Sequence, residues 1–209
     1  AYTVYDGHMP TLEVLRRSEA FCAAIREAVG DRADLLFGTH GQFTAAGAIR
    51  LARSIEAYDP LWFEEPTGER LTTKHEFHRV LAAGAAAILQ PALGRSGGIL
   101  ETKKIAAIAE VYGAQIAPHL YCGPIEALAN IQLSACIPNF LILESIRDFG
   151  GFHAELLSRP IEWEDGYVIP PTEPGLGREL DEEVARANPW TGTTLHLEMK
   201  TTPNRPGRH

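Results

Sequence analysis

Acidic side chains follow directly after an apolar, strand-like segment in the first third of the chain. Residues 61–63 favour a β-strand, Glu64 and Glu65 come next, and Glu69 lies a little further on. In α/β folds the chemistry is found at the carboxyl ends of the strands, so such a strand can deliver ligand side chains to a site. The alternative is an ordinary strand end whose glutamates face solvent, because short motifs often occur without function.

Polar side chains also end the other strand-like segments. Five segments have the composition of buried strands, at residues 34–40, 60–64, 86–91, 114–119 and 140–144. Their terminal polar residues are His40, Glu64, Gln90, His119 and Glu144. Because the carboxyl ends of the strands of a barrel converge on one mouth, we expect these side chains to lie at one site.

Segments with helical spacing separate the predicted strands, at residues 12–29, 44–57, 73–83, 100–112 and 124–136. Strict alternation of apolar strands and helices predicts an α/β fold with a parallel sheet covered by helices. Successive units begin about 25 to 30 residues apart, which is typical of a TIM-type (β/α) barrel. A doubly wound sheet is the alternative, but it would gather ligands at one crevice instead of at every strand end.

Composition excludes several classes of protein. Of the 209 residues, 45% are hydrophobic and 22% are charged, which is enough for one large core. The net charge of −8, without a basic block, argues against nucleic acid or an anionic membrane as a partner. There is no apolar run long enough for a membrane span, no signal-peptide pattern and no CxxC pair, so we expect a cytoplasmic protein with reduced thiols.

Several motifs, taken in order, resemble those of the enolase superfamily. They are FEEP, TGER, ILQP with GRSGGI, APH, a final LE, and DGYVIPP with PGLG. More narrowly, they are similar to the mandelate racemase group and its acid-sugar dehydratases of the galactonate dehydratase kind. The resemblance runs from about residue 1 to residue 187. It implies a modified (β/α) barrel that removes the proton α to a carboxylate while Mg²⁺ stabilises the enediolate.

The resemblance also implies a role for each site residue. Glu64 and Glu69 would bind Mg²⁺, which prefers hard oxygen ligands. His119 would contact the substrate as general base, and His40 would protonate the departing β-hydroxyl. Glu144 would hydrogen-bond the substrate carboxylate and its enediolate. The plainer alternatives are a structural histidine at 119, a simple turn at 38–41 and a buried carboxylate at 144 that only needs a partner.

The chain departs from the family pattern at several points. Gly38 stands where the family has its first metal ligand, and Ala92 stands where an aspartate supports the base. Between Glu64 and Glu69 roughly 20 or more residues of a βα unit are missing. The family's lysine motif and its capping domain would precede residue 1.

These observations together predict an incomplete TIM-type barrel with about six of the eight βα units and a C-terminal capping segment. We expect residues 1–144 to form the partial catalytic barrel, residues 145–200 to pack on it, and residues 201–209 to be a disordered tail. An incomplete barrel exposes strand edges, so we also expect a homo-oligomer.

The leading functional hypothesis is a Mg²⁺-dependent lyase that eliminates water from an acid sugar such as an aldonate. A racemase or epimerase of the same superfamily is an alternative, but it needs a second base, typically from the absent lysine motif. The other alternative is a truncated homologue that is catalytically impaired or inactive, which Gly38, Ala92 and the short Glu64–Glu69 spacing favour.

Overall fold

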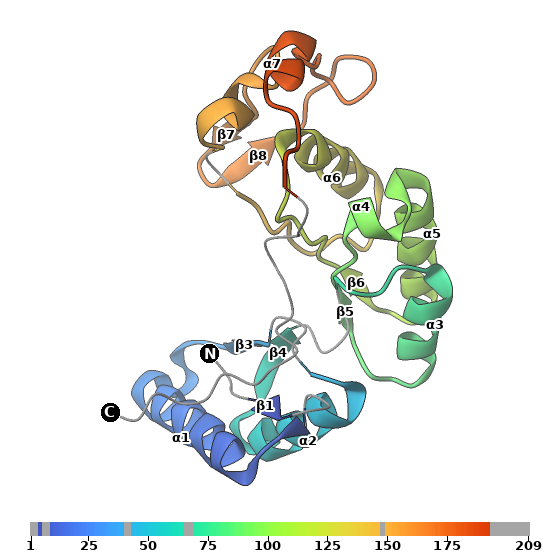
Figure 1. Ribbon diagram of the computed structural model, residues 1–209. Helices are drawn as coiled ribbons and strands as arrows, with labels where there is room; N and C mark the ends of the chain where they lie inside the picture. The colour runs from blue at the N-terminus through green and yellow to red at the C-terminus, as the bar shows by residue number, and fades with distance from the viewer. Residues whose placement is uncertain (1–3, 6–8, 40–42, 65–68, 147–148, 193–209) are drawn as a thin grey trace. The chain divides into compact units, whose positions relative to one another are not determined.

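The chain divides into two compact units in the computed structural model (Figure 1). Residues 4–5, 9–39, 43–64, 69–146 and 149–192 are described. Unit 1 comprises residues 1–67 and 193–209, and unit 2 comprises residues 68–192. The division falls between Glu64 and Glu69, the two carboxylates that the resemblance assigns to one metal. The domain boundaries predicted at residues 144 and 200 stay predictions.

Unit 1 contains two pairs of strands and two long helices. Its elements are β1 Val4–Tyr5, β2 Met9–Pro10, α1 Leu12–Val29, the 3₁₀ turn η1 Gly30–Arg32, β3 Leu35–Gly38, α2 Ala45–Ile55, the 3₁₀ turn η2 Glu56–Tyr58 and β4 Pro60–Glu64. β1 and β2 pair antiparallel, whereas β3 and β4 pair parallel. The strands of the β1–β2 pair have two residues each and are too short to leave a recognisable periodicity in the sequence.

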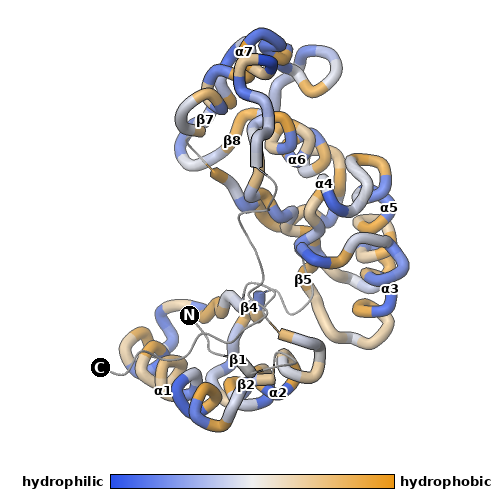
Figure 2. The backbone as a smooth tube through the Cα atoms, in the orientation of Figure 1, coloured by the Kyte–Doolittle hydropathy of each residue, from blue (hydrophilic) through white to orange (hydrophobic). Residues whose placement is uncertain are grey.

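Sequence signals fix both ends of α1. The backbone N–H of Val14 donates to the hydroxyl oxygen of Thr11, which caps the helix. The helix ends at Val29, and the residue that follows it, Gly30, has a φ of 55° that suits glycine. Hydrophobic and hydrophilic residues alternate along α1 (Figure 2), so that Leu15 and Cys22 face the core. Arg26 then ties the helix to the start of β4 by donating to the carbonyl oxygens of Tyr58 and Asp59.

The core of unit 1 lies between its helices and one face of the β3–β4 pair. Its buried residues are Leu15, Cys22, Phe43, Ala48, Leu51 and Ile55, with Phe37, Tyr58 and Phe63 packed against them. Leu36 and Leu61, on the two strands, remain 59% and 61% exposed. The parallel register places Gly38 directly beside Glu64. The sheet therefore brings the predicted metal ligand Glu64 next to the position where the family's first ligand is missing.

Unit 2 begins with a helix and continues with alternating strands and helices. Its elements are α3 Lys74–Ala82, β5 Ile88–Leu89, α4 Leu93–Ser96, α5 Gly98–Val111, β6 Gln115–Ile116, α6 Pro124–Cys136, the 3₁₀ turn η3 Gly151–Glu155, β7 Glu162–Glu164, β8 Tyr167–Ile169 and α7 Glu182–Ala187. The helices predicted at 73–83, 100–112 and 124–136 are confirmed to within one or two residues at each end.

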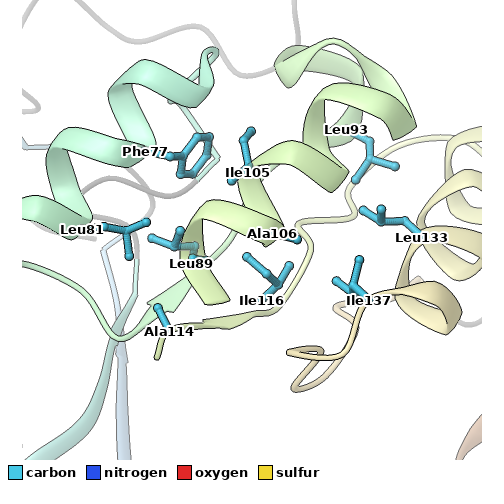
Figure 3. Packing of buried hydrophobic residues seen from close by; sticks show 11 residues of the cluster. Phe77, Leu81, Leu89, Leu93, Ile105, Ala106, Ala114, Ile116, Leu133 and Ile137 are labelled. Carbon is cyan, nitrogen blue, oxygen red and sulfur yellow. The ribbon is translucent and has the colours of Figure 1, made fainter. Parts of the chain in front are cut away.

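One apolar cluster joins α3, β5, α4, α5, β6 and α6 of unit 2 (Figure 3). Its buried residues are Phe77, Leu81, Leu89, Leu93, Ile105, Ala106, Ala109, Ala114, Ile116, Leu133 and Ile137. Phe77 and Ile105 are fully buried and come from α3 and α5, while Ile116 belongs to the strand beneath them. This core holds the strand ends in fixed positions.

The parallel pairing in unit 2 extends beyond the two named strands. β5 pairs with β6, and the same ladder continues to a bridge between Ala92 and His119. On the other side, Ile116 pairs in parallel with Phe140. The strand predicted at 140–144 therefore begins as expected, but residues 141–146 form no regular strand. Even so, three successive segments run in parallel toward His119 and Glu144.

The last part of unit 2 is an antiparallel hairpin and a short helix. β7 and β8 pair antiparallel, and Leu157 pairs with Leu180. The nearly buried Arg178 donates to Glu162 and Glu173, at 2.8 and 2.9 Å, and so joins the hairpin to the chain that follows it. α7 is largely hydrophilic (Figure 2) and is capped by Asp181, whose side chain accepts from two backbone N–H groups. Within the described parts of both units, none of the helices combines the length and apolar character needed to span a membrane.

Candidate active site

His119 lies at the end of the parallel ladder of unit 2. Its backbone N–H donates to the carbonyl oxygen of Pro91 at 3.1 Å, and Ala92 is its neighbour in the parallel pairing. The backbone is thus anchored to the adjacent strand while the side chain projects from the strand end. The sequence predicted this placement from the apolar run before His119.

Both ring nitrogens of His119 contact carboxylates. Nε2 lies 2.9 Å from Oε2 of Glu69, and Nδ1 lies 2.7 Å from Oε2 of Glu144. The three side chains come from the start, the middle and the later part of unit 2. Folding of this unit therefore brings together three of the five residues that the sequence predicted for the site.

The carboxylate of Glu144 is the more exposed of the two. Its side chain is 42% exposed, and Oε2 also accepts from the backbone N–H of Leu120 at 3.0 Å. Partial burial favours the neutral acid, but the hydrogen bonds from His119 and Leu120 outweigh it and lower the pKa of Glu144. Glu144 is therefore an anion at neutral pH, positioned where a ligand can reach it.

Two carboxylates control the charge of His119. Burial opposes the imidazolium, but the hydrogen bonds and negative charges of Glu144 and Glu69 outweigh it and raise the pKa of His119 to about 10. At neutral pH the ring thus carries a proton on each nitrogen. It must give up one of these protons before it can act as a base.

Glu69 is buried between two cationic side chains. The residue is only 1% exposed. Its Oε2 contacts His119, and its Oε1 lies 3.9 Å from Nε of Arg70. A buried carboxylate needs such partners, because an uncompensated charge in the protein interior is costly. The sequence did not predict the contacts of Glu69 with Arg70 and His119. The only signal for them was the basic residue type at position 70.

Glu64 lies in unit 1, at the end of β4, and its surroundings differ from those of Glu69. Its Oε2 is 2.6 Å from the point where a Cβ on Gly38 would lie. The carboxylate therefore occupies the space of the side chain that Gly38 lacks. His40, the predicted acid, lies outside the described residues.

The donor set around Glu69 does not fit magnesium in this arrangement. Mg²⁺ prefers several oxygen ligands, whereas Glu69 has cationic groups facing both of its oxygens. In the described ranges of the two units, no group of three histidine, cysteine or acidic side chains is arranged to hold a metal ion. The assignment of Glu64 and Glu69 as Mg²⁺ ligands stays a prediction.

A second polar contact, which the motifs did not predict, joins α6 to the segment that begins at Gly94. The carboxylate of Glu126, in the first turn of α6, accepts from the backbone N–H of Gly94 at 2.9 Å. It lies 2.7 Å from where a Cβ on Gly94 would be, so a larger residue at this position would push the flexible end of the Glu126 side chain aside. Burial, and then the Glu126 carboxylate, raise the pKa of the Cys122 thiol, which keeps this thiol protonated. The start of the GRSGG segment thus packs against α6.

Comparison with known proteins identifies the family. A model of the Enolase C-terminal domain-like family matches residues 7–68 and 67–184. The match comes in two stretches that meet between Glu64 and Glu69, where the spacing is shorter than the family pattern. Together the stretches span well over half of the chain.

Curated relatives include several acid-sugar dehydratases. A D-xylonate dehydratase from Haloferax volcanii is 35% identical over 92% of this chain and 52% of its own length. A D-galactonate dehydratase from Pectobacterium atrosepticum is 36% identical over 79% of this chain and 50% of its own length. The chain therefore spans about half the length of the curated relatives that it matches.

Solved structures share the fold at higher identity. A provisionally named mandelate racemase/muconate lactonizing enzyme from Labrenzia alexandrii is 65% identical, with a TM-score of 0.81, over 99% of this chain and 58% of that chain. A mandelate racemase/muconate lactonizing enzyme from Sulfitobacter is 57% identical, with a TM-score of 0.80, over 98% of this chain and 57% of that chain. The fold is thus of the α/β TIM-barrel type, while the number of βα units stays a prediction. With its family match, its dehydratase relatives and these structural neighbours, the chain belongs to the Enolase C-terminal domain-like family.

Proposed function

We propose that the chain carries the proton-transfer part of a lyase site that removes water from an acid sugar. The observation that carries this proposal is the position of His119, with Nε2 on the buried Glu69 and Nδ1 on the exposed Glu144. The names of the curated relatives support the choice of reaction, since they include xylonate, gluconate and galactonate dehydratases.

The first step prepares the base. A substrate carboxylate that approaches the exposed Glu144 brings a second negative charge near it, which favours the protonated form of Glu144. The proton on Nδ1 of His119 then passes to Glu144 across 2.7 Å. Glu144 can now donate a hydrogen bond to the substrate carboxylate, while His119 becomes a neutral imidazole whose Nδ1 can accept a proton.

The second step is the elimination. Nδ1 of His119 takes the proton from the carbon α to the substrate carboxylate, and the hydrogen bond from Glu144 stabilises the enediolate that forms. The bond between the β-carbon and its hydroxyl then breaks. His119 returns its proton to the departing hydroxyl, which leaves as water. The remaining enol rearranges to a 2-keto-3-deoxy acid, so atoms and charges balance.

Magnesium belongs to the proposal only as an expectation from the family. When bound, a divalent cation would neutralise charge on the substrate carboxylate. The resemblance assigns the cation to Glu64 and Glu69, but the cationic groups beside Glu69 do not fit it, so no ligand set is proposed. None of the steps above depends on this cation.

The test is turnover of aldonates by the full chain, with and without Mg²⁺. Xylonate, gluconate and galactonate are incubated with the protein, and 2-keto-3-deoxy acids are detected by mass spectrometry. His119→Asn should lower the rate by about 100-fold or more, because it removes the general acid–base group. His75→Asn, an exposed histidine of α3, is the matched control and should leave the rate unchanged. Absence of product from the unmodified chain under both conditions would refute the proposal.

An inactive homologue is the second candidate, and one observation favours it. The Glu64 carboxylate fills the space beside Gly38 where the family has its first metal ligand. A chain that binds aldonates without converting them would support this candidate. Isothermal titration with the same aldonates distinguishes it from the lyase.

A further inference from the structure

We propose that Glu69 is a positioning residue for His119. Its buried carboxylate accepts from Nε2 and so fixes the ring with Nδ1 directed at Glu144. The catalytic meaning of this role rests on the proposed function, whereas the contact itself can be tested without any activity.

The burial of the two side chains supports this role. Glu69 is 1% exposed, and the side chain of His119 is 17% exposed. A hydrogen bond between charged groups in such surroundings is stronger than one at the surface, because little water competes for it. The Nε2 contact at 2.9 Å therefore restricts rotation of the ring far more than a solvated partner would.

The neighbouring strand cannot supply this support. Ala92 lies beside His119 in the parallel pairing, and its methyl group offers neither charge nor hydrogen bond. The adjacent Pro91 holds the backbone of His119 and not its ring. A carboxylate that orients the imidazole must come from elsewhere in the unit, and Glu69 supplies it from the segment before α3.

The same geometry disagrees with a metal-binding role for Glu69. His119 and Arg70 face its two oxygens, so a divalent cation at Glu69 would lie next to two positive groups. For Glu69 to bind a metal, Nε2 of His119 would have to move away from the Glu69 carboxylate. As described, Glu69 orients a histidine and does not bind a metal.

Two variants separate these roles. Glu69→Gln keeps an oxygen that can accept from Nε2 but loses the negative charge, whereas Glu69→Leu loses both. The matched control is Glu101→Gln, which removes a carboxylate from α5 that pairs with Lys74. Each variant is studied by NMR of the His119 imidazole and by thermal unfolding with and without Mg²⁺.

The positioning role predicts a graded result. The Nε2 proton of His119 should be slow to exchange in the unmodified chain and in Glu101→Gln. In Glu69→Gln the NMR signal of this proton should move upfield but remain visible. In Glu69→Leu the proton should exchange freely with water. Where the unmodified chain turns over an aldonate, kcat should fall by about 100-fold in Glu69→Leu and much less in Glu69→Gln, with little change in KM.

Two results would overturn the inference. The first is an Nε2 proton in Glu69→Gln whose chemical shift and exchange rate equal those of the unmodified chain. This result does not require the leucine variant to fold. The second is a rise in melting temperature with Mg²⁺ that both Glu69 variants lose and Glu101→Gln retains. If the unmodified chain shows no turnover while the imidazole signals follow the graded pattern, the inference holds and the proposed function fails.

Discussion

At the scale of single residues, the charge of His119 depends on its two carboxylates. The resemblance implied that the histidine at this strand end is a general base. The contacts with Glu144 and Glu69 instead raise the pKa of His119 to about 10. The sequence also indicated that a carboxylate after the apolar residues 140–143 needs a partner, and the structure supplies His119 and the N–H of Leu120.

This raised pKa predicts how stability depends on pH in the absence of metal. Between about pH 6.5, the ordinary value of histidine, and pH 10, the folded chain binds more protons at His119 than the unfolded chain does. The stabilisation from His119 is therefore fully present below about pH 6.5 and is lost as the pH rises through 10.

Urea unfolding in EDTA at a series of pH values measures this effect. The stability difference between the unmodified chain and His119→Asn should shrink steadily from pH 7 to pH 10, while His75→Asn should show no such trend. A difference that stays constant over this range would show that the two carboxylates do not hold the proton on His119.

At the scale of elements, local signals define most helix ends. The capping box of α3 is an example: Thr73 accepts from the N–H of Glu76, and Glu76 accepts from the N–H of Thr73 at 2.8 Å. Thr73→Ala should destabilise unit 2 by about 1 kcal/mol, because helix N-cap replacements cost about this much. Chemical denaturation measures the loss, with His75→Ala on the same helix as the control. Equal stabilities of the two variants would contradict the prediction.

The β3–β4 pair offers a test of how a metal ligand could be restored. Gly38→Asp places a second carboxylate beside Glu64, whose flexible end must move aside. Without metal the two like charges should repel and lower the melting temperature of the variant.

Millimolar Mg²⁺ should reverse this loss, because a ligand that binds only the folded state stabilises it. Gly38→Asn is the matched control, since it has nearly the same size without the charge. A melting temperature of Gly38→Asp that does not respond to Mg²⁺ would show that the end of this sheet cannot form a metal site.

At the scale of the whole molecule, each unit has its own apolar core. Phe77 is fully buried in unit 2, so Phe77→Ala should cost about 3 to 5 kcal/mol through lost burial and a cavity. Val111→Ala, at a position that is 83% exposed in the same unit, should have little effect. Hydrogen exchange of Phe77→Ala should show a loss of amide protection in unit 2. Amide protection in unit 1 should equal that of the unmodified chain. Loss of protection in unit 1 as well would show that the two units unfold together.

The sequence alone determined the family resemblance, the order of strands and helices, and the residues that could do chemistry. These features depend on local periodicity, capping residues and short motifs, which a single sequence displays. Local spacing does not settle burial, however: Ile49 occupies an apolar position of α2 and is 52% exposed, because the spacing of apolar residues does not say which of them the core reaches.

Only the tertiary structure decided which of these residues meet. It placed Glu69 and Glu144 on opposite nitrogens of His119, and it placed Glu64 in the other unit beside Gly38. Contacts between residues far apart in the chain depend on how strands pair and helices pack, and no local pattern records them. For the same reason the charge of His119 could not be predicted, since a pKa follows from burial and from the charges that folding brings within a few ångströms.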